Sequence, residues 1–168
     1  LGPAVYGVDE QSLESVIGGL LVRQRKTLAV AESCTGGLVS NRLTDVPGSS
    51  RYLRGSVIAY HNRIKQEVLD VGPDLLGAHG AVSAPVARAM AEGVRRRLGA
   101  DVGVAVTGIA GPSGGTKAKP VGLVYLAVAD RRGVTAQQYL LHGDRLAIKG
   151  QAAQVALDLL RRRLSKSV

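Results

Sequence analysis

The sequence contains one cysteine and neither tryptophan nor phenylalanine among its 168 residues. A single cysteine, Cys34, excludes an intramolecular disulfide and is typical of a reducing compartment, so we expect a cytoplasmic protein. The only aromatic side chains are five tyrosines, which leaves few surfaces on which single-stranded bases could stack. This composition disfavours a nucleic-acid-binding function.

Long apolar runs are also missing. The longest, Val121–Ala129, has the length of a strand and falls far short of the roughly 20 residues that a membrane helix needs, so we predict no membrane span. The chain does not begin with methionine, and its first residues lack the basic-then-apolar pattern of a signal peptide. We expect residues 1–8 to be a tail or the remnant of a linker in a longer chain.

Acidic residues are few compared with basic ones, because 13 Asp and Glu face 22 Lys and Arg, which gives a net charge of +9. Such an excess is typical of proteins that bind anions, nucleic acids included. The cations, however, cluster near the expected C-terminal ends of helices, where they complement the helix dipole. We therefore interpret them as a solvated surface and expect no nucleic-acid partner. The clusters are Arg23/Arg25/Lys26, Arg95–Arg97 and Arg161–Arg163.

The length and the 45% hydrophobic content predict one globular domain, residues 9–168, of the α/β class. Apolar periodicity predicts helices over residues 9–26, 35–45, 63–69, 84–98 and 144–164, the last burying Leu146, Val155 and Leu159. Apolar, β-branched runs predict strands over residues 27–31, 55–60, 101–106, 121–129 and 134–141. The last two strands should form a hairpin through the turn at residues 130–133. This order predicts a mixed sheet covered by helices.

Ser33 and Cys34 follow a predicted buried strand and enter the start of a helix. Unpaired N–H groups in a first helical turn stabilise negative charge, so a nucleophile there would lie beside a ready oxyanion site. Gly36 and Gly37 would let a substrate approach the backbone closely. The alternative is structural: Ser33 or Thr35 caps the helix.

Lys65 follows a second strand end, in the segment from Tyr60 to Lys65. If Asn62 caps the helix, Lys65 occupies its third position, where the helix dipole and burial both favour the neutral amine. A neutral lysine can take a proton from a serine hydroxyl, and Tyr60 could relay that proton or hold the amine. The alternatives are a solvated lysine on an exposed helix, or a rival nucleophile–base pair of Cys34 with His61.

The loop from Thr107 to Lys117 is rich in glycine and leaves the end of a central strand. Glycines at this density let successive N–H groups converge on a phosphate or carboxylate, although a mobile connection is an equal alternative. The spacing fits neither a Walker A loop nor a dinucleotide fingerprint. Arg145, at the start of the last helix, could pair with a phosphate or remain exposed. The three histidines lack ligand spacing, so no metal site is predicted.

Together these segments resemble the CinA C-terminal domain, the nicotinamide-nucleotide amidohydrolase family also called PncC. The resemblance covers residues 9–163 and rests on residues 32–37 (ESCTGG), 60–65 (Y-x-N-x-x-K), 80–83 (GAVS), 106–116 (VTGIAGP-x-GGT) and 143–145 (GDR). It implies a three-layer α/β/α sandwich around a mixed sheet.

The resemblance also implies a reaction: hydrolysis of nicotinamide mononucleotide to nicotinic acid mononucleotide and ammonia, without metal or cofactor. Ser33 would be the nucleophile and Lys65 the base, with Tyr60 beside them. The turn of Cys34, Thr35, Gly36 and Gly37 would hold the oxyanion, and Thr107, Gly108 and Arg145 would hold the nucleotide, with Gly111, Gly114 and Gly115 in the same loop.

We also have three expectations about the partners of this chain. The ligand is a small nucleotide, the chain forms a homo-oligomer, and a longer chain would add an N-terminal molybdopterin-binding-like domain. The alternative is a non-catalytic module connected with competence or DNA damage.

Overall fold

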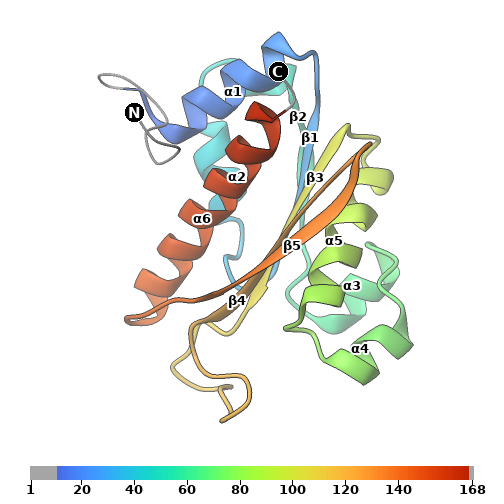
Figure 1. Cartoon of the computed structure of the whole chain (residues 1–168), viewed down its shortest axis with the longest axis vertical. Coiled ribbons are helices and arrows are strands. Elements are labelled where there is room, and N and C mark those ends of the chain that lie inside the picture. The colour runs from blue at the N-terminus through green and yellow to red at the C-terminus, as the bar shows by residue number, and fades with distance from the viewer. Residues whose placement is uncertain (1–10, 167–168) are drawn as a thin grey trace.

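A five-stranded mixed sheet forms the centre of the molecule in the computed structural model, which describes residues 11–166 (Figure 1). The strand order is β2-β1-β3-β4-β5. The first three are parallel, whereas β4 and β5 form an antiparallel hairpin that joins β3 through β4. Their bounds are β1 Leu28–Glu32, β2 Leu53–Ile58, β3 Val102–Gly108, β4 Leu123–Asp130 and β5 Gly133–Leu140. The expected mixed sheet and terminal hairpin are confirmed.

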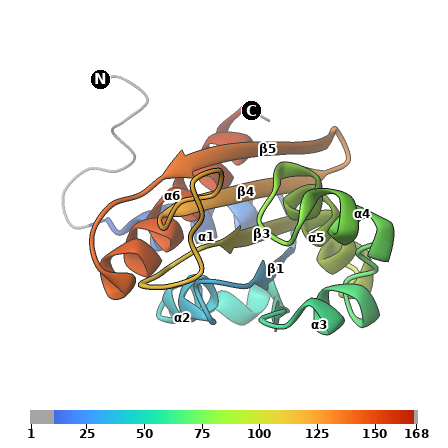
Figure 2. The ribbon, with the colours of Figure 1, turned by 90° about the horizontal axis from the view of Figure 1, so that it is seen from below.

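Helices cover both faces of this sheet and complete a three-layer α/β/α sandwich, as Figures 1 and 2 show. One layer contains α1 (Leu13–Arg23), α2 (Leu38–Thr44) and α6 (Arg145–Ser165), and the other α3 (Asn62–Glu67), α4 (Pro73–His79) and α5 (Ala84–Arg97). None of the helices within residues 11–166 is both long and apolar enough to cross a bilayer.

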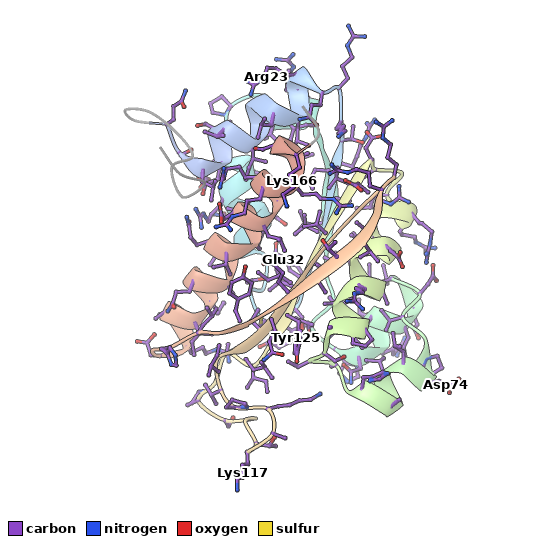
Figure 3. All side chains as sticks on the ribbon, in the orientation of Figure 1. Arg23, Glu32, Asp74, Lys117, Tyr125 and Lys166 are labelled. Atoms are coloured by element: carbon purple, nitrogen blue, oxygen red, sulfur yellow. The ribbon has the colours of Figure 1, made fainter. Side chains whose placement is uncertain are left out.

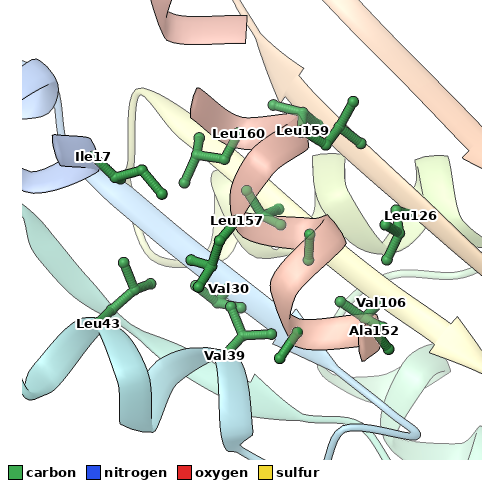
Figure 4. Packing of buried hydrophobic residues seen from close by; sticks show 14 of the residues in the cluster. Ile17, Val30, Val39, Leu43, Val106, Leu126, Ala152, Leu157, Leu159 and Leu160 are labelled. Carbon is green, nitrogen blue, oxygen red and sulfur yellow. The ribbon is translucent and has the colours of Figure 1, made fainter. Parts of the chain in front are cut away.

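The two faces of the sheet differ in the size of their side chains. Toward α1, α2 and α6 the strands present valine and leucine, including Val30, Val106 and Leu126 (Figure 4). Toward α5 they present mainly alanine, such as Ala29, Ala31, Ala105 and Ala127. Because alanine side chains are short, α5 lies close to the strands on that face.

Several predicted boundaries are wrong for identifiable reasons. Helix α2 begins at Leu38 rather than Thr35, because Gly36 and Gly37 adopt left-handed φ angles of 63° and 100°. Helix α3 ends at Glu67, before the predicted end at residue 69, and Gly72-Pro73 instead begins α4, a helix that we did not predict, with Pro73 in the first helical turn.

Two further expectations concern the start of the last helix and the N-terminal residues. Leu146 is 75% exposed and lies outside the core, so its predicted burial is wrong. The expected tail and the first residues of the predicted first helix lie outside the described residues.

Gly93 marks the closest approach of α5 to the connection that precedes α4. A Cβ atom at Gly93 would lie 1.9 Å from the carbonyl oxygen of Leu69. We therefore expect Gly93→Ala to lower the free energy of unfolding by about 2 kcal/mol or more, through overpacking. Gly150→Ala in α6 is the matched control, since its Cβ would meet nothing within 4 Å and should raise stability by up to about 1 kcal/mol. Urea denaturation of both variants is the measurement, and a stable Gly93→Ala protein would contradict this packing.

Candidate active site

Ser33 and Lys65 meet at the carboxyl end of the parallel strands. Ser33 follows β1 directly, and its N–H donates to the carbonyl oxygen of Val106 at 3.0 Å, which holds it beside β3. Lys65 projects from α3, and its Nζ lies 3.2 Å from Ser33 Oγ. The same Nζ donates to the carbonyl oxygen of Ala59 at 2.7 Å. The structure thus brings the expected nucleophile and base into hydrogen-bond contact.

Burial controls the protonation of Lys65. The side chain is only 1% exposed, and desolvation lowers the pKa of its amine below the ordinary value of 10.5. It forms no ion pair with a carboxylate of residues 11–166. The expected helix position is corrected: His61 rather than Asn62 caps α3, so Lys65 is the fourth residue of a short helix. Desolvation, and not the helix dipole, is therefore the cause of the shift.

Cys34 lacks the properties of a nucleophile. Burial raises the pKa of its thiol to about 12, which keeps it protonated at neutral pH. The rival base is engaged elsewhere, because His61 Nδ1 accepts a hydrogen bond from the Arg63 N–H at 3.2 Å and the ring is exposed. The Cys34–His61 pair is therefore not assembled.

A buried glutamate caps α2 and shapes the turn after Ser33. Glu32 Oε2 accepts from the N–H groups of Gly37 at 3.0 Å and Val39 at 3.1 Å, while Oε1 accepts from the N–H and Oγ of Ser40 at 2.9 Å and 2.6 Å. Figure 3 shows Glu32 in the middle of the molecule. The sequence patterns gave no role to Glu32. A charged residue at the end of the otherwise apolar strand Leu28–Ala31 could have indicated that its carboxylate binds nearby donors.

The turn that follows Ser33 offers two backbone donors. Gly36 N–H donates to the carbonyl oxygen of Ser33 at 3.1 Å, and Gly37 N–H is taken by Glu32. Within residues 11–166, the N–H groups of Cys34 and Thr35 make no hydrogen bond to another residue. The expected oxyanion donors are thereby narrowed to Cys34 and Thr35. Neither Ser33 nor Thr35 caps α2, and Thr35 Oγ1 is buried without a partner in the described chain.

A cleft of about 290 Å³ opens over Ser33 and Lys65. Nine expected site residues line it: Ser33, Cys34, Tyr60, Lys65, Thr107, Gly108, Gly111, Gly114 and Arg145. Thr35, Gly36, Gly37 and Gly115 are not among the lining residues. Sequence reasoning missed six residues that line the cleft, namely Asn62, Ala81, Val82, Ile109, Ala110 and Ser113.

Arg145 and Tyr60 form one wall of the cleft. Arg145 Nη1 donates to the carbonyl oxygen of Gly111 at 2.7 Å, and Nη2 donates to the Tyr60 hydroxyl at 2.7 Å. Tyr60 is 59% exposed, and its hydroxyl contacts Arg145 rather than the lysine amine. The expected contact of Tyr60 with Lys65 is thus replaced by a contact that joins α6 to the end of β2.

The glycine-rich loop that begins at Thr107 packs closely against the turn of residues 33–37. A Cβ atom at Gly108 would lie 2.7 Å from Val124 Cγ2 and 3.1 Å from Cys34 Sγ. Beside it, Thr107 is buried and its hydroxyl donates to the carbonyl oxygen of Ala81 at 2.8 Å. These residues shape the wall of the cleft. No group of three or more acidic, histidine or cysteine side chains suited to a metal ion occurs within residues 11–166.

Comparison with known proteins gives one family. Residues 10–164 match the CinA C-terminal domain. A CinA-like protein of Gloeobacter violaceus is 53% identical over 161 residues, covering 95% of this chain and 38% of that protein, and one of Gemmatimonas aurantiaca is 51% identical over 166 residues, covering 99% and 39%. The chain thus spans about 40% of the length of these relatives.

A solved structure is similar over nearly its whole length. The crystal structure of competence/damage inducible protein CihA from Agrobacterium tumefaciens matches with a TM-score of 0.87 and 38% sequence identity, covering 96% of this chain and 98% of that one. This likeness agrees with the α/β/α fold described above.

Glu32 provides a test of how the nucleophile turn is held. In Glu32→Gln the side-chain NH₂ group would face N–H donors in place of a carboxylate oxygen, so we expect the free energy of unfolding to fall by about 2–3 kcal/mol. Ser40→Ala, which removes only one of the four donors to Glu32, should cost about 1 kcal/mol. Urea denaturation measures both. Equal stability of Glu32→Gln and the parent protein would contradict the capping role of Glu32.

Proposed function

The chain belongs to the CinA C-terminal domain family, and on that premise we propose that it is an amidohydrolase acting on the carboxamide of nicotinamide mononucleotide. The products are nicotinic acid mononucleotide and ammonia. One observation supports the proposal above all: a buried lysine amine, with its pKa lowered by desolvation, lies 3.2 Å from a serine hydroxyl.

The neutral form of Lys65 suits the role of base. A neutral amine has two N–H bonds and one lone pair, so it can donate to the Ala59 carbonyl oxygen while accepting the Ser33 proton. Proton transfer by a positioned base contributes about 10²–10⁴ in rate. Lys65 belongs to α3, and Ser33 directly follows β1 and is bonded through its N–H to the Val106 carbonyl oxygen, so regular elements hold the two side chains next to one another.

The reaction has two steps, in which Ser33 is first acylated and the acyl ester is then hydrolysed. Ser33 Oγ forms a bond to the carboxamide carbon, its proton passes to Lys65 Nζ, and the carbonyl oxygen becomes an oxyanion. The N–H groups of Cys34 and Thr35 donate to that oxyanion, at about 3 kcal/mol for each well-placed donor. Protonated Lys65 then gives its proton to the leaving nitrogen, and ammonia departs. Water attacks the acyl ester, Lys65 takes one of its protons and returns it to Ser33 Oγ, and the carboxylic acid that is released gives its remaining proton to ammonia or to the solvent.

Arg145 is the proposed partner of the substrate phosphate. Its contacts with Gly111 and Tyr60 use one N–H from each Nη, and a guanidinium carries five N–H donors, so donors remain for an anion. The net charge of +9 also attracts a phosphorylated substrate. Asn62 and Ser113, which line the same cleft, add neutral polar groups beside it.

The cellular compartment, the additional domain and the oligomeric state form part of the same proposal. A free, buried Cys34 thiol fits a reducing cytoplasm. Relatives that extend well beyond the matched region fit a longer protein with an N-terminal molybdopterin-binding-like domain. A homo-oligomer is also proposed, and sedimentation of the purified chain measures its assembly state.

The test is release of ammonia from nicotinamide mononucleotide. We expect Ser33→Ala to lower kcat/KM by at least about 10³, because it removes the nucleophile. Cys34→Ser, which preserves the size of the neighbouring side chain, should retain activity within about tenfold because the thiol is not a participant. Loss of activity in Cys34→Ser with full activity in Ser33→Ala would make the protein a cysteine hydrolase and refute this assignment.

A substrate without phosphate tests the proposed role of Arg145 in the same assay. Nicotinamide riboside lacks the phosphate that Arg145 is proposed to bind, so its kcat/KM should be at least tenfold lower. If none of these nicotinamide compounds yields ammonia, the result favours the non-catalytic module related to competence or DNA damage.

A further inference from the structure

A second cavity lies at the opposite end of the sheet from Ser33. Its volume is about 560 Å³, larger than the catalytic cleft. Lys26 and Asp101 come just before β1 and β3, whereas Ser33 and Gly108 stand at the other ends of these strands. At about 3.3 Å per residue, the seven residues of β3 separate the two sites by roughly 20 Å. Figure 3 shows Lys166, another lining residue, well above Lys117 of the glycine-rich loop.

Cations dominate the lining of this cavity. Two carboxylates of the described chain, residues 11–166, line it as well, and both are engaged by neighbouring groups. Asp101 accepts from the N–H and the hydroxyl of Thr27 at 2.8 Å each, and Asp130 is bonded to Arg132 and Arg163. These contacts lower the pKa of both carboxyl groups, so they stay ionised at neutral pH. The six cationic residues that line the cavity are Arg25, Lys26, Arg95, Arg131, Arg132 and Lys166.

Arg95 is the residue that most clearly lacks a partner. Its Nε atom is buried, and no hydrogen-bond acceptor within residues 11–166 reaches it. A buried donor without an acceptor is unfavourable, and an anion in the cavity would remove that cost. The base of the side chain is fixed, because Arg95 Cβ packs against Gly103 of β3. The side chains of Arg25, Arg131 and Lys166 likewise make no hydrogen bond or ion pair with the described residues.

We propose that this cavity binds a small anion that carries two or more phosphoryl groups. The unpartnered cations come from four separate places in the fold: the loop after α1, the last turn of α5, the turn between β4 and β5, and the end of α6. Because the cations stand on several sides of a cavity of about 560 Å³, a chain of phosphates can contact more of them than a single phosphate can. Arginine is the residue best suited to pairing with phosphate oxygens.

The lining residues also indicate which part of such a ligand is recognised. No tyrosine among residues 11–166 lines the cavity, so this part of the chain offers no aromatic side chain on which a nucleobase could stack. The recognised group is therefore the phosphate chain rather than a base or a single strand of nucleic acid. The four contributing elements converge at the ends of β1, β3 and β4, far from Lys65 and Arg145, so the cavity and the catalytic cleft can be studied separately.

Isothermal titration with inorganic tripolyphosphate at fixed, low ionic strength tests the proposal. We expect saturable binding, and Arg95→Gln should weaken it about tenfold or more, since an ionic hydrogen-bond partner is removed. Arg97→Gln is the matched control, because Arg97 is an exposed residue of the same helix that does not line the cavity and carries the same charge. It should change the affinity by no more than about twofold.

Two more variants keep the test decisive. Arg131→Gln, in an exposed turn, should weaken binding several-fold without affecting the fold, so it replaces Arg95→Gln if that variant unfolds. Arg145→Gln, in the catalytic cleft, should leave the affinity unchanged. Equal losses in Arg95→Gln and Arg97→Gln would reduce the binding to general attraction by a basic surface and overturn the proposal. Loss of binding in Arg145→Gln alone would place the phosphate in the catalytic cleft and overturn it as well.

Discussion

The burial of the Lys65 amine next to the Ser33 hydroxyl is the constraint around which the proposed catalytic end of the molecule is arranged. An ammonium group loses much of its hydration when only 1% of its side chain is exposed, so the fold disfavours the charged form. Residues 11–166 supply a carbonyl acceptor from Ala59 but no carboxylate paired with the amine that would stabilise the charge. This environment costs stability, and it favours the neutral, proton-accepting form of the Lys65 amine more than water does around a solvated lysine.

The α/β/α architecture explains how two residues 32 positions apart come to share this environment. Parallel strands β1 and β2 end at the same edge of the sheet, so the residues that follow them are neighbours in space. Glu32 then turns the chain away from the sheet by binding the first N–H groups of α2, which leaves the Cys34 and Thr35 donors unoccupied. The nucleophile, the base and the backbone donors thus depend on two strand ends and one buried carboxylate.

Local patterns were sufficient to predict the strands and the β4–β5 hairpin. For Ser33 and Lys65 they left structural alternatives open, and the resemblance to a known family singled out the pair, whose reactive atoms lie 3.2 Å apart. The start of α2 could not be predicted from apolar spacing, since the Glu32 cap that fixes it acts from five to eight residues away. The contact between Tyr60 and Arg145 joins segments 85 residues apart, and no local pattern contains it. Leu146 has the spacing of a buried residue but lies in the first turn of α6, where its side chain is exposed to solvent. The same limit applies to the basic cavity: each arginine cluster looks solvated on its own helix, and only the topology places Arg25, Arg95 and Arg131 around one space.

The central claim is that Lys65 is a neutral amine when it meets Ser33, and a direct measurement is the titration of the protein's lysine side chains by NMR, with ¹³C at Cε. The Lys65→Arg variant identifies the resonance of Lys65 by its disappearance. We predict that this amine loses its proton at a pH below 10.5, and that Ser33→Ala does not restore the ordinary value because burial causes the shift. A Lys65 resonance that titrates at or above 10.5, together with the exposed lysines, would contradict the account.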